Sequence, residues 1–176
     1  PIYEAIIKEK VLDIEYKSFF EIKPRKFFFH PYFLKEYNNR WFVFGYNEDT
    51  KVSTWNLALD RIISLKPADK KYRNFEFDWE QYFSDIIGVT HLEGATPEKI
   101  LLEFNEKSAP YVITKPLHHS QKHWYENNKL IVEIFVAPNF ELIQNILYYG
   151  QNVKVLSPES IKELIKKELQ EALNNY

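Results

Sequence analysis

Arginine and aromatic residues lie close together between Phe29 and Ile63, and this stretch carries the most informative chemistry of the sequence. An aromatic face can stack on a planar ligand, and a guanidinium group can bind a phosphate or carboxylate through two parallel hydrogen bonds. The candidates for binding a ligand or nucleic acid are His30, Tyr32, Arg40, Trp41, Phe42, Trp55 and Arg61. We therefore expect a groove or pocket here for a planar, anionic molecule.

Several of these candidates also have a purely structural interpretation. Arg61 could bind a phosphate, or it could form a surface ion pair with Asp60 or Glu15, and such pairs contribute little to stability. Trp41 could stack on a base, but tryptophan is highly buried on average, which favours a place in the core. His30 could donate to a phosphate or simply be a hydrogen-bonded structural residue.

Strand alternation separates Arg40 from Trp41 in the predicted strand 40–46. One face would carry Trp41, Val43 and Gly45, and the other would carry Arg40, Phe42, Phe44 and Tyr46. Because both faces carry aromatic residues, the pattern does not decide which face is inside. One interpretation has the tryptophan hold the core while Arg40 and Phe42 contact the ligand.

Catalytic and metal-binding patterns do not occur in the sequence. It has no G-x-S-x-G, H-E-x-x-H or P-loop motif, no cysteine and only 4 glycines. On a strand, His119 and His123 share a face while His118 points the other way, and no acidic partner lies at ligand spacing. We expect no enzymatic activity, no cofactor and no metal, and a packing or interface role for these histidines.

The candidate residues fall among five predicted short strands that follow a short helical pattern at 2–10. Tight turns are expected at Asn38-Asn39, where both residues tolerate positive φ, and at 47–50. The strands are predicted at 11–20, 27–33, 40–46, 52–59 and 62–67. Pro31 interrupts the second strand, which suits an edge or a bulge. Such a series predicts a small curled sheet or barrel over 1–67.

The remainder divides into a linker, 68–97, and a second module, 98–176. The linker has a basic run at Lys70, Lys71 and Arg73, then a short helix after Asp78 with Gly88 as C-cap. In the second module, strands are predicted at 100–104, 118–125, 130–136 and 153–156, with a turn at 126–129 around Asn127-Asn128. Helices are predicted at 109–114, at 140–147 and from Ser157-Pro158 to Leu173, with Ser157 as N-cap and Pro158 as the first helical residue. This β-α-β-β-α-β-α order predicts a ferredoxin-like module, so the fold class is α+β.

Composition indicates a folded protein of one or two domains, since 45% of the 176 residues are hydrophobic. The net charge of -2 argues against a dedicated duplex-DNA binder, although residues 1–75 carry 14 Lys and Arg against 10 Asp and Glu. No apolar run is long enough for a membrane span and no signal peptide is seen, so a cytoplasmic location is expected. A chain that begins with Pro1 and lacks methionine is either a fragment or has lost its initiator residue.

The order of motifs resembles the WYL-domain transcriptional regulators of bacteria. The Trp-Tyr-Leu signature corresponds to Trp41-Phe42-Val43, preceded by Pro31 and Leu34 and closed by Leu59-Asp60-Arg61-Ile62. The C-terminal part resembles the extension that usually follows a WYL domain. Its marks are His118-His119-Ser120-Gln121, Gly150 and Val153-Lys154-Val155-Leu156-Ser157-Pro158.

The resemblance implies an Sm-like, SH3-type β-barrel for the first module. It also implies the ligand-sensing and oligomerisation part of a regulator that binds a nucleotide or single-stranded nucleic acid and forms a homodimer. In such regulators an upstream helix-turn-helix binds DNA, and none is found in these 176 residues. A dimerisation scaffold without a ligand is the alternative.

The sequence departs from the family pattern at two expected arginines. The family often shows Arg-x-aromatic-Arg before the Leu-Asp-Arg-Ile segment, where this chain has Trp55, Leu57 and Ala58. Trp55 could replace charge with stacking. The missing cations bear on the nucleic-acid ligand more than on the fold.

Overall fold

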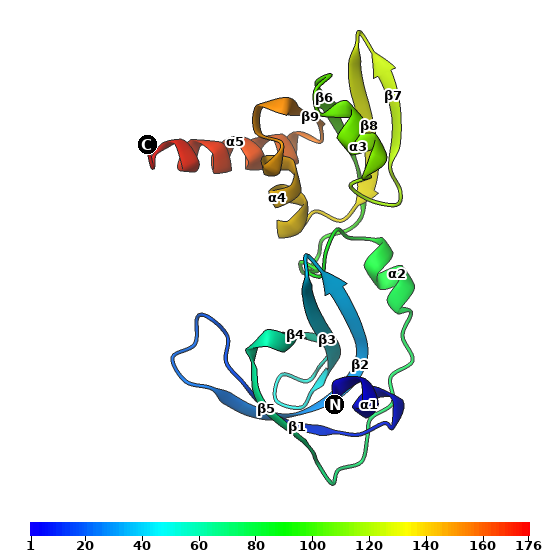
Figure 1. Ribbon diagram of the computed structural model, residues 1–176, viewed down its shortest axis with the longest axis vertical. Helices are drawn as coiled ribbons and strands as arrows, with labels where there is room; N and C mark the ends of the chain where they lie inside the picture. Colours follow the sequence, from blue (N-terminus) through cyan, green and yellow to red (C-terminus); the bar gives the residue numbers. More distant parts are fainter. The chain divides into compact units, whose positions relative to one another are not determined.

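Two compact units, Pro1–Trp79 and Glu80–Tyr176, make up the computed structural model, which describes residues 1–176 (Figure 1). Each unit has one antiparallel sheet and its own hydrophobic core. The predicted α+β class is confirmed. The finer division into 1–67, 68–97 and 98–176 stays a prediction. No helix has the length and apolar character needed to cross a membrane.

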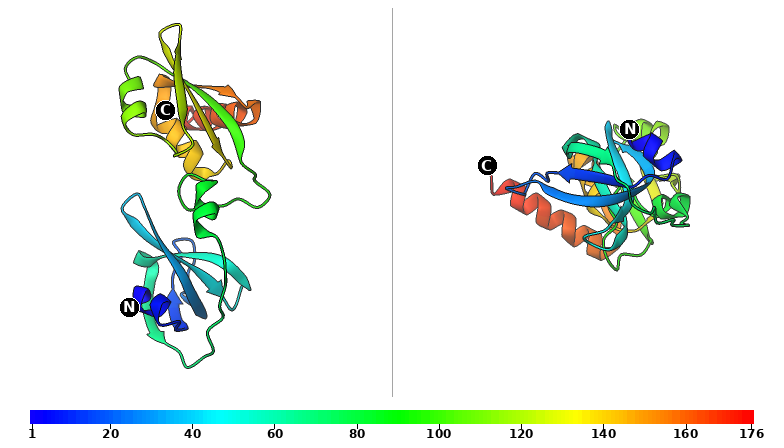
Figure 2. Two further views of the ribbon diagram at one scale, coloured as in Figure 1. Left: turned by 90° about the vertical axis from the view of Figure 1, so that its right-hand side faces the viewer. Right: turned by 90° about the horizontal axis from the view of Figure 1, so that it is seen from below.

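The first unit is a curled five-stranded sheet with one short helix beside it (Figures 1 and 2). Its elements are α1 (Ile2–Ile7), β1 (Leu12–Tyr16), β2 (Arg25–Tyr37), β3 (Arg40–Asn47), β4 (Val52–Ala58), the 3-10 turn η1 (Leu59–Arg61) and β5 (Ile62–Pro67). The strand order is β4-β3-β2-β1-β5, and the edge strands β4 and β5 do not pair with each other. A closed barrel is therefore not found.

Alternate residues of β1 face the first core, as the alternation of apolar and polar residues in the sequence predicts. Leu12, Ile14 and Tyr16 of β1 are buried while Asp13 and Glu15 are partly exposed. Helix α1 and the strands β1 to β4 all contribute buried residues to this core. They are Ile2, Ala5, Leu12, Ile14, Tyr16, Phe27, Phe29, Val43 and Leu57. Leu59, Ile62 and Leu65 pack against it from η1 and β5.

β2 is longer than predicted and passes through a bulge at Pro31. It lies between β1 and β3, so Pro31 is at a bulge rather than on an edge strand, and the register with β3 shifts between Pro31 and Phe33. Pro31 lies opposite Gly45 of β3. A Cβ on Gly45 would lie 2.1 Å from the backbone oxygen of His30, so only glycine allows this close approach.

Both predicted Asn-Asn turns are confirmed. Asn38 and Asn39 have φ of 49° and 59°, and Asn127 and Asn128 have φ of 47° and 62°. Two consecutive residues with positive φ define a type I′ turn, whose twist matches that of the flanking strands. Each turn fixes the register of its hairpin, β2–β3 in the first unit and β7–β8 in the second.

The second unit holds a four-stranded sheet in the order β7-β8-β6-β9. After α2 (Trp79–Ser84), its elements are β6 (Glu98–Phe104), α3 (Ala109–Thr114), β7 (Lys122–Glu126), β8 (Lys129–Val136), α4 (Phe140–Tyr148), the 3-10 turn η2 (Gly150–Asn152), β9 (Val153–Ser157) and α5 (Glu159–Leu173). Every element predicted for 98–176 is present, but β7 begins four residues later than expected. The segment 118–121 instead forms a turn around His118.

Helices α3, α4 and α5 all contribute to the core on one face of this sheet. The inward side chains come from alternate positions of the central strands, Ile100, Leu102 and Phe104 of β6 and Leu130, Val132, Ile134 and Val136 of β8. Leu101, Glu133 and Phe135 therefore lie on the opposite face, which no helix covers. The far end of α5 extends beyond the sheet towards the C-terminus (Figures 1 and 2).

Two predicted helix caps were wrong. Gly88 lies four residues after the end of α2, because Ile86 and Ile87 turn into the interior instead of continuing the helix. Gly88 has φ of +85°, and a Cβ there would lie 2.6 Å from the side chain of Glu141. For α5, Pro158 rather than Ser157 is the N-cap, and no side chain caps the helix.

Candidate functional site

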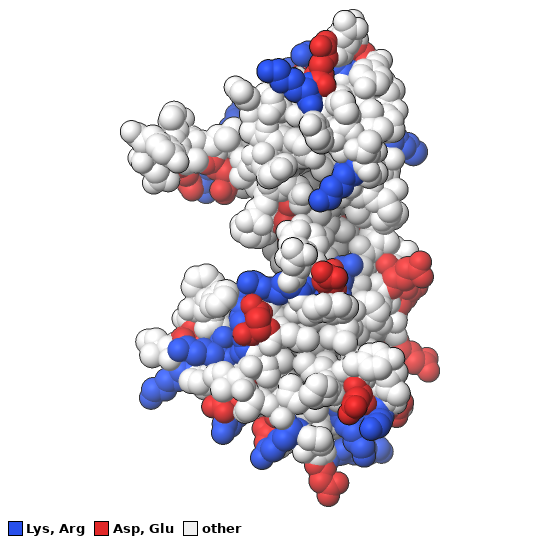
Figure 3. All heavy atoms as spheres, in the orientation of Figure 1, with Lys and Arg blue, Asp and Glu red and all other residues white.

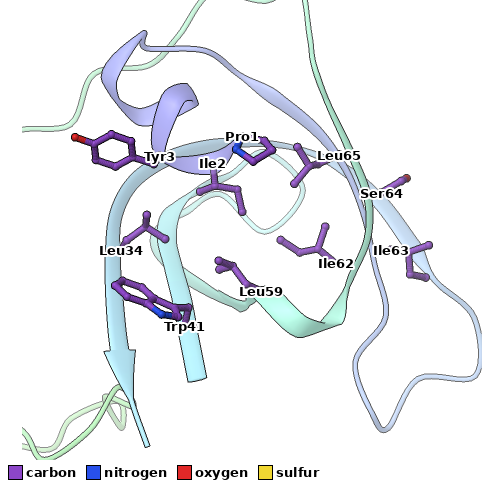
Figure 4. Close-up of a pocket in the computed structure, with 10 residues that line it drawn as sticks. All are labelled: Pro1, Ile2, Tyr3, Leu34, Trp41, Leu59, Ile62, Ile63, Ser64 and Leu65. Atoms are coloured by element: carbon purple, nitrogen blue, oxygen red, sulfur yellow. The ribbon is translucent and has the colours of Figure 1, made fainter. Parts of the chain in front are cut away.

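An apolar groove opens beside α1 in the first unit, and the signature tryptophan lines it. The groove has a volume of about 670 Å³ and is lined by Pro1, Ile2, Tyr3, Leu34, Trp41, Leu59, Ile62, Ile63, Ser64 and Leu65. Figure 4 shows Ile2, Leu59 and Ile62 pointing into a common space, with Leu34 and Trp41 along one rim. Apart from the Ser64 and Tyr3 hydroxyls, the side chains that line the groove are apolar. The groove therefore suits the planar, poorly hydrated face of a ligand.

Trp41 is not a core residue, which corrects the interpretation that it holds the barrel together. Its side chain is 49% exposed. It is the second residue of β3, near the Asn38-Asn39 turn and opposite Glu36, where the hairpin extends past the packed core. Val43, which shares its face, is fully buried deeper along the same strand. An exposed indole face at the rim of an apolar groove can stack on a planar ligand.

Both faces of β3 are covered, which explains why alternation alone could not orient it. Val43 faces the core of the curled sheet, while Phe44, on the other face, packs against Trp79 with ring centroids 5.8 Å apart. Trp79 also stacks on Phe33 at 5.4 Å. It ends a segment, residues 68–79, that we call the strap. The strap crosses the outer face of β2 and β3.

Arg40 forms an ion pair across the sheet end. Its Nε lies 3.2 Å from Oδ2 of Asp60 in η1, and both side chains are more than 40% exposed. Such an exposed pair contributes little to stability, but it partly neutralises this cation. Phe42 is half-buried beside it, and Trp55 packs partly buried against the first core. Neither Phe42 nor Trp55 is among the groove residues.

Arg61 takes neither of the two ion-pair partners considered from the sequence. Asp60 pairs with Arg40, and Glu15 accepts a hydrogen bond from Ser64 and faces Lys26 at 3.8 Å. The guanidinium carbon of Arg61 instead lies 3.9 Å from the ring centroid of Phe19, a cation–π contact.

The Nε of Arg61 is buried without a hydrogen-bond partner. Leaving a charged donor unsatisfied costs free energy, and no group of the chain offsets this cost at the Arg61 Nε. Arg61 sits between Leu59 and Ile62 in the sequence, and both of those residues line the groove. The loop that carries Phe19 also exposes Phe20 (96%) and Ile22 (92%).

His30 and Tyr32 hold the strap rather than lining the groove. His30 is 3% exposed, and its Nδ1 accepts a hydrogen bond from the backbone N–H of Arg73 at 2.9 Å. The Tyr32 hydroxyl donates to the Arg73 carbonyl at 2.7 Å, and the Tyr72 hydroxyl donates to the Pro31 carbonyl at 2.5 Å. Burial raises the pKa of Tyr32 to about 12, although nearby Arg73 lowers it.

The basic run of the linker is largely used inside the strap. Lys70 binds Glu48 at 2.5 Å and lies 3.9 Å from the Phe28 ring centroid, while the Arg73 guanidinium lies 4.4 Å from that of Tyr46. Burial favours a raised pKa for Glu48, but hydrogen bonds from Lys70 and His30 outweigh it, and the pKa of the carboxyl is lowered. On the face in Figure 3, acidic and basic side chains intermingle instead of forming one basic stripe.

The three histidines near residue 120 do not form a metal site. The chain has no cluster of three or more His, Cys, Asp or Glu side chains arranged to hold a metal ion. His118 is 9% exposed, its Nδ1 lies 2.8 Å from the Ser120 hydroxyl, and its ring is 4.0 Å from that of His119. Burial, with the neighbouring His119, lowers the pKa of His118 to about 4. This cluster shapes the turn before β7.

Sequence reasoning located one wall of the groove but missed the other. The motif series points to Trp41 and Leu34, whereas Tyr3, Ile63 and Leu65 fall only in the predicted short helix and the predicted fifth strand. Ile63 is 55% exposed and Tyr3 is 67% exposed. β5 pairs with β1 on one side only, and apolar residues on such an edge strand are a signal for an open surface, which Ile62-Ile63-Ser64-Leu65 carries.

Comparisons with known proteins agree with the motif series. The WYL domain family matches residues 1–67, and the WCX domain family matches residues 96–173. No curated protein sequence matches the chain. A solved structure of a CRISPR Cas-related protein is similar in fold, with a TM-score of 0.55 and 14% identity over 99% of this chain and 51% of that one.

A second solved structure, proteasome accessory factor B/C (PafBC) of Arthrobacter aurescens, aligns with 19% identity and a TM-score of 0.39. The match covers 99% of this chain and 26% of that one. This chain thus spans about a quarter of the PafBC chain and about half of the CRISPR Cas-related protein. The two domain matches together account for most of the chain and follow the order of its two units, so the chain contains a WYL domain followed by a WCX domain.

Proposed function

We propose that the first unit is the ligand-sensing part of a transcriptional regulator and that its groove binds a nucleotide or single-stranded nucleic acid. The observation that carries this proposal is the half-exposed indole of Trp41 at the rim of an apolar groove of about 670 Å³. Such a surface can hold a base by stacking, which contributes about 1–3 kcal/mol per base. The match of residues 1–67 to the WYL domain supports a regulatory role.

In this proposal, Arg61 binds the anionic part of the ligand. Its buried, unpartnered Nε is the charged donor nearest in sequence to the groove residues Leu59 and Ile62. A phosphate oxygen that reached it would satisfy a donor that has no acceptor in the free chain. Arg40 contributes less, because Asp60 already pairs with it. Base stacking on Trp41 with one phosphate contact at Arg61 is the binding mode that this arrangement favours.

The proposal places no enzymatic step in the chain. The groove is lined by apolar side chains and two hydroxyl groups, without a carboxylate or histidine among them. A binding site of this composition can select a ligand by shape and stacking, but it offers no general base within its walls. In this proposal, ligand binding changes how the regulator contacts DNA through a helix-turn-helix upstream of these residues.

Two finer fold assignments belong to the same proposal. The order β4-β3-β2-β1-β5 with a 3-10 turn between β4 and β5 supports an Sm-like, SH3-type arrangement of the first unit. The order β7-β8-β6-β9, with helices between β6 and β7 and between β8 and β9, supports a ferredoxin-like second unit.

The binding test uses the whole chain and fluorescence anisotropy of a short labelled single-stranded DNA of mixed sequence, with unlabelled nucleotides as competitors. We expect Trp41→Ala to weaken binding about tenfold, since the loss of one stacked base costs roughly 1.4 kcal/mol. Arg61→Ala should weaken binding and also reduce its dependence on salt concentration, because one phosphate contact is lost.

Two matched controls accompany these variants. Tyr148→Ala removes an aromatic side chain that is 84% exposed in the second unit, and Arg25→Ala removes a surface arginine that pairs with Glu21. Both should bind like the unchanged chain. The proposal is wrong if the unchanged chain does not bind the labelled DNA at low salt. It is also wrong if the Trp41 and Arg61 variants bind this DNA as tightly as the two control variants do.

A dimerisation scaffold is the second candidate, and the exposed apolar side chains of α5 favour it. Leu164 is 39% exposed, Leu169 is 50% exposed and Leu173 is 65% exposed, all on the helix that extends beyond the sheet. A homodimer is also part of the regulator proposal. Ligand binding in the groove therefore separates the two candidates, whereas self-association alone does not.

A further inference from the structure

The hairpin strand β7 forms an open edge of the second sheet. It pairs only with β8, and all five of its residues are exposed (Figure 1). An exposed edge strand presents unpaired backbone N–H and C=O groups, which can pair with a strand from another chain. Edges of this kind usually carry charges or prolines that discourage pairing, so the pattern of charges on β7 is informative.

The turn at Asn127-Asn128 determines which backbone groups point outwards. Its flanking residues, Glu126 and Lys129, pair with each other, and in such a turn the first carbonyl accepts from the last N–H. Hydrogen-bonded and non-hydrogen-bonded pairs alternate along an antiparallel ladder. Trp124 and Lys122 therefore also direct their backbone groups to β8. The N–H and C=O groups of His123 and Tyr125 are left pointing away from the sheet.

The charges of β7 are placed symmetrically about Trp124. Lys122 lies two residues before it and Glu126 two residues after it, and all three side chains share the face of the sheet that no helix covers. The Trp124 Nε1 donates to a Glu126 carboxylate oxygen at 2.9 Å, which holds that carboxylate on this face. The strand is thus complementary in charge to an antiparallel copy of itself.

We propose that β7 pairs with β7 of a second copy of this chain, antiparallel and centred on Trp124. This pairing joins the outward backbone groups of His123 in one copy to those of Tyr125 in the other. It places Lys122 opposite Glu126 twice and the two Trp124 side chains opposite each other. These three contacts fall at non-hydrogen-bonded positions, where facing side chains are closest.

Other registers do not pair the charges. Centring on His123 places Lys122 opposite Trp124, and centring on Tyr125 places Glu126 opposite Trp124 and Lys122 opposite the turn residue Asn128. Only the Trp124 register uses both charges and the outward backbone groups together. The interface is distinct from the ligand groove of the first unit, so the inference does not depend on the proposed function.

A charge-exchange experiment on the whole chain tests this pairing by sedimentation velocity over a wide concentration range. Lys122→Glu and Glu126→Lys should each weaken self-association about tenfold or more, because the two-fold axis turns both opposite-charge pairs into like-charge pairs. The double exchange, Lys122→Glu with Glu126→Lys, should restore association. Mixing the two single variants should produce a heterodimer, since each then supplies the charges that the other lacks.

Controls and a second readout make the outcome decisive. Lys8→Glu and Glu4→Lys on α1 change the same charges outside β7 and α5 and should leave association unchanged. On association of the unchanged chain, amide hydrogen exchange should slow at His123 and Tyr125. A monomer throughout the concentration range, single variants that associate normally, or mixed variants that stay apart would each overturn the proposal.

Discussion

The two hairpins, β2–β3 and β7–β8, share the same Asn-Asn turn but differ in what surrounds their strands. In the first, β1 and β4 pair with the outer edges, and the core and the strap cover the two faces of β3. In the second, β7 has an open edge and five exposed residues. Local sequence specifies the turn in both cases, but only tertiary packing decides whether the hairpin becomes interior structure or a surface.

Tryptophan also has two uses in and around these hairpins. Trp79 lies flat on Phe33 of the covered hairpin and fastens the strap, whereas Trp41 and Trp124 are 49% and 38% exposed on surfaces for which we propose partners. A tryptophan in a strand is therefore not evidence of a core position by itself. Away from the exposed Trp41, substitutions in the covered hairpin should change stability, whereas substitutions in the open hairpin should change association.

The largest expected effect is at the point where the covered hairpin is tightest. Gly45→Ala places a methyl group 2.1 Å from the His30 backbone oxygen, so the strands must separate. We expect a loss of about 3 kcal/mol in the free energy of unfolding of the first unit, at the upper end of overpacking costs. Chemical denaturation followed by the tryptophan fluorescence of that unit measures it.

Gly94→Ala is the matched control for this substitution. Gly94 has φ of +76°, but nothing lies within 4 Å of the added Cβ, so only the backbone conformation is penalised, by roughly 1 kcal/mol. Equal effects of the two substitutions would mean that the close approach of β2 and β3 is not what requires glycine at position 45.

An intermediate effect is expected when the same turn residue is changed in each hairpin. Asn39→Ala and Asn128→Ala should each cost about 1 kcal/mol locally, because alanine is unfavourable at positive φ. In the covered hairpin the loss should appear as lower stability of the whole first unit. In the open hairpin it should appear as faster amide hydrogen exchange confined to β7. The same global loss from both substitutions would contradict the contrast between the hairpins.

The smallest effect at neutral pH is the dependence of stability on pH. Its direction differs between the two units and distinguishes them most clearly. Burial raises the pKa of Tyr32 from 10.0 to about 12, so this contribution to stability is complete below pH 10 and is lost as the pH rises towards 12. Burial lowers the pKa of His118 from 6.5 to about 4, so the second unit should lose stability as the pH falls from 6.5 towards 4.

Denaturation across this pH range, with Tyr32→Phe and His118→Gln as variants, checks the two slopes. Tyr32→Phe should flatten the alkaline slope of the first unit without changing the acid slope of the second. His118→Gln should do the reverse. An alkaline slope that remains unchanged in Tyr32→Phe would show that this hydroxyl is not the group responsible.

The parts of the fold that follow from neighbouring residues could be predicted from the sequence. Both Asn-Asn turns, the alternation of β1 and the order of elements in the second unit depend on local φ preference and periodicity, and they appear where expected. The boundary of β7 depends on the turn around His118, where the Ser120 hydroxyl is hydrogen-bonded to the backbone of Phe135 in β8. These contacts leave no periodic signal.

The candidate site was only partly predictable, for the same physical reason. Exposed aromatic and arginine residues identified Trp41 and Arg61, but the ion pair between Arg40 and Asp60 joins residues that meet only when the sheet curls. His30 and Tyr32 were read as ligand contacts, and they are occupied by the strap instead. A polar residue on a strand looks the same in the sequence whether its partner is a ligand or a distant part of the chain.

The attachment of the strap has an evolutionary consequence. Its hydrogen bonds with His30, Tyr32 and Pro31 use the main-chain N–H and C=O of Arg73 and the hydroxyl of Tyr72. Main-chain groups are the same for almost every amino acid, so substitutions at position 73 should keep these hydrogen bonds and lose only the contact of the guanidinium with the Tyr46 ring. Selection should therefore preserve the receiving side chains on β2 more strictly than the strap residue that they hold.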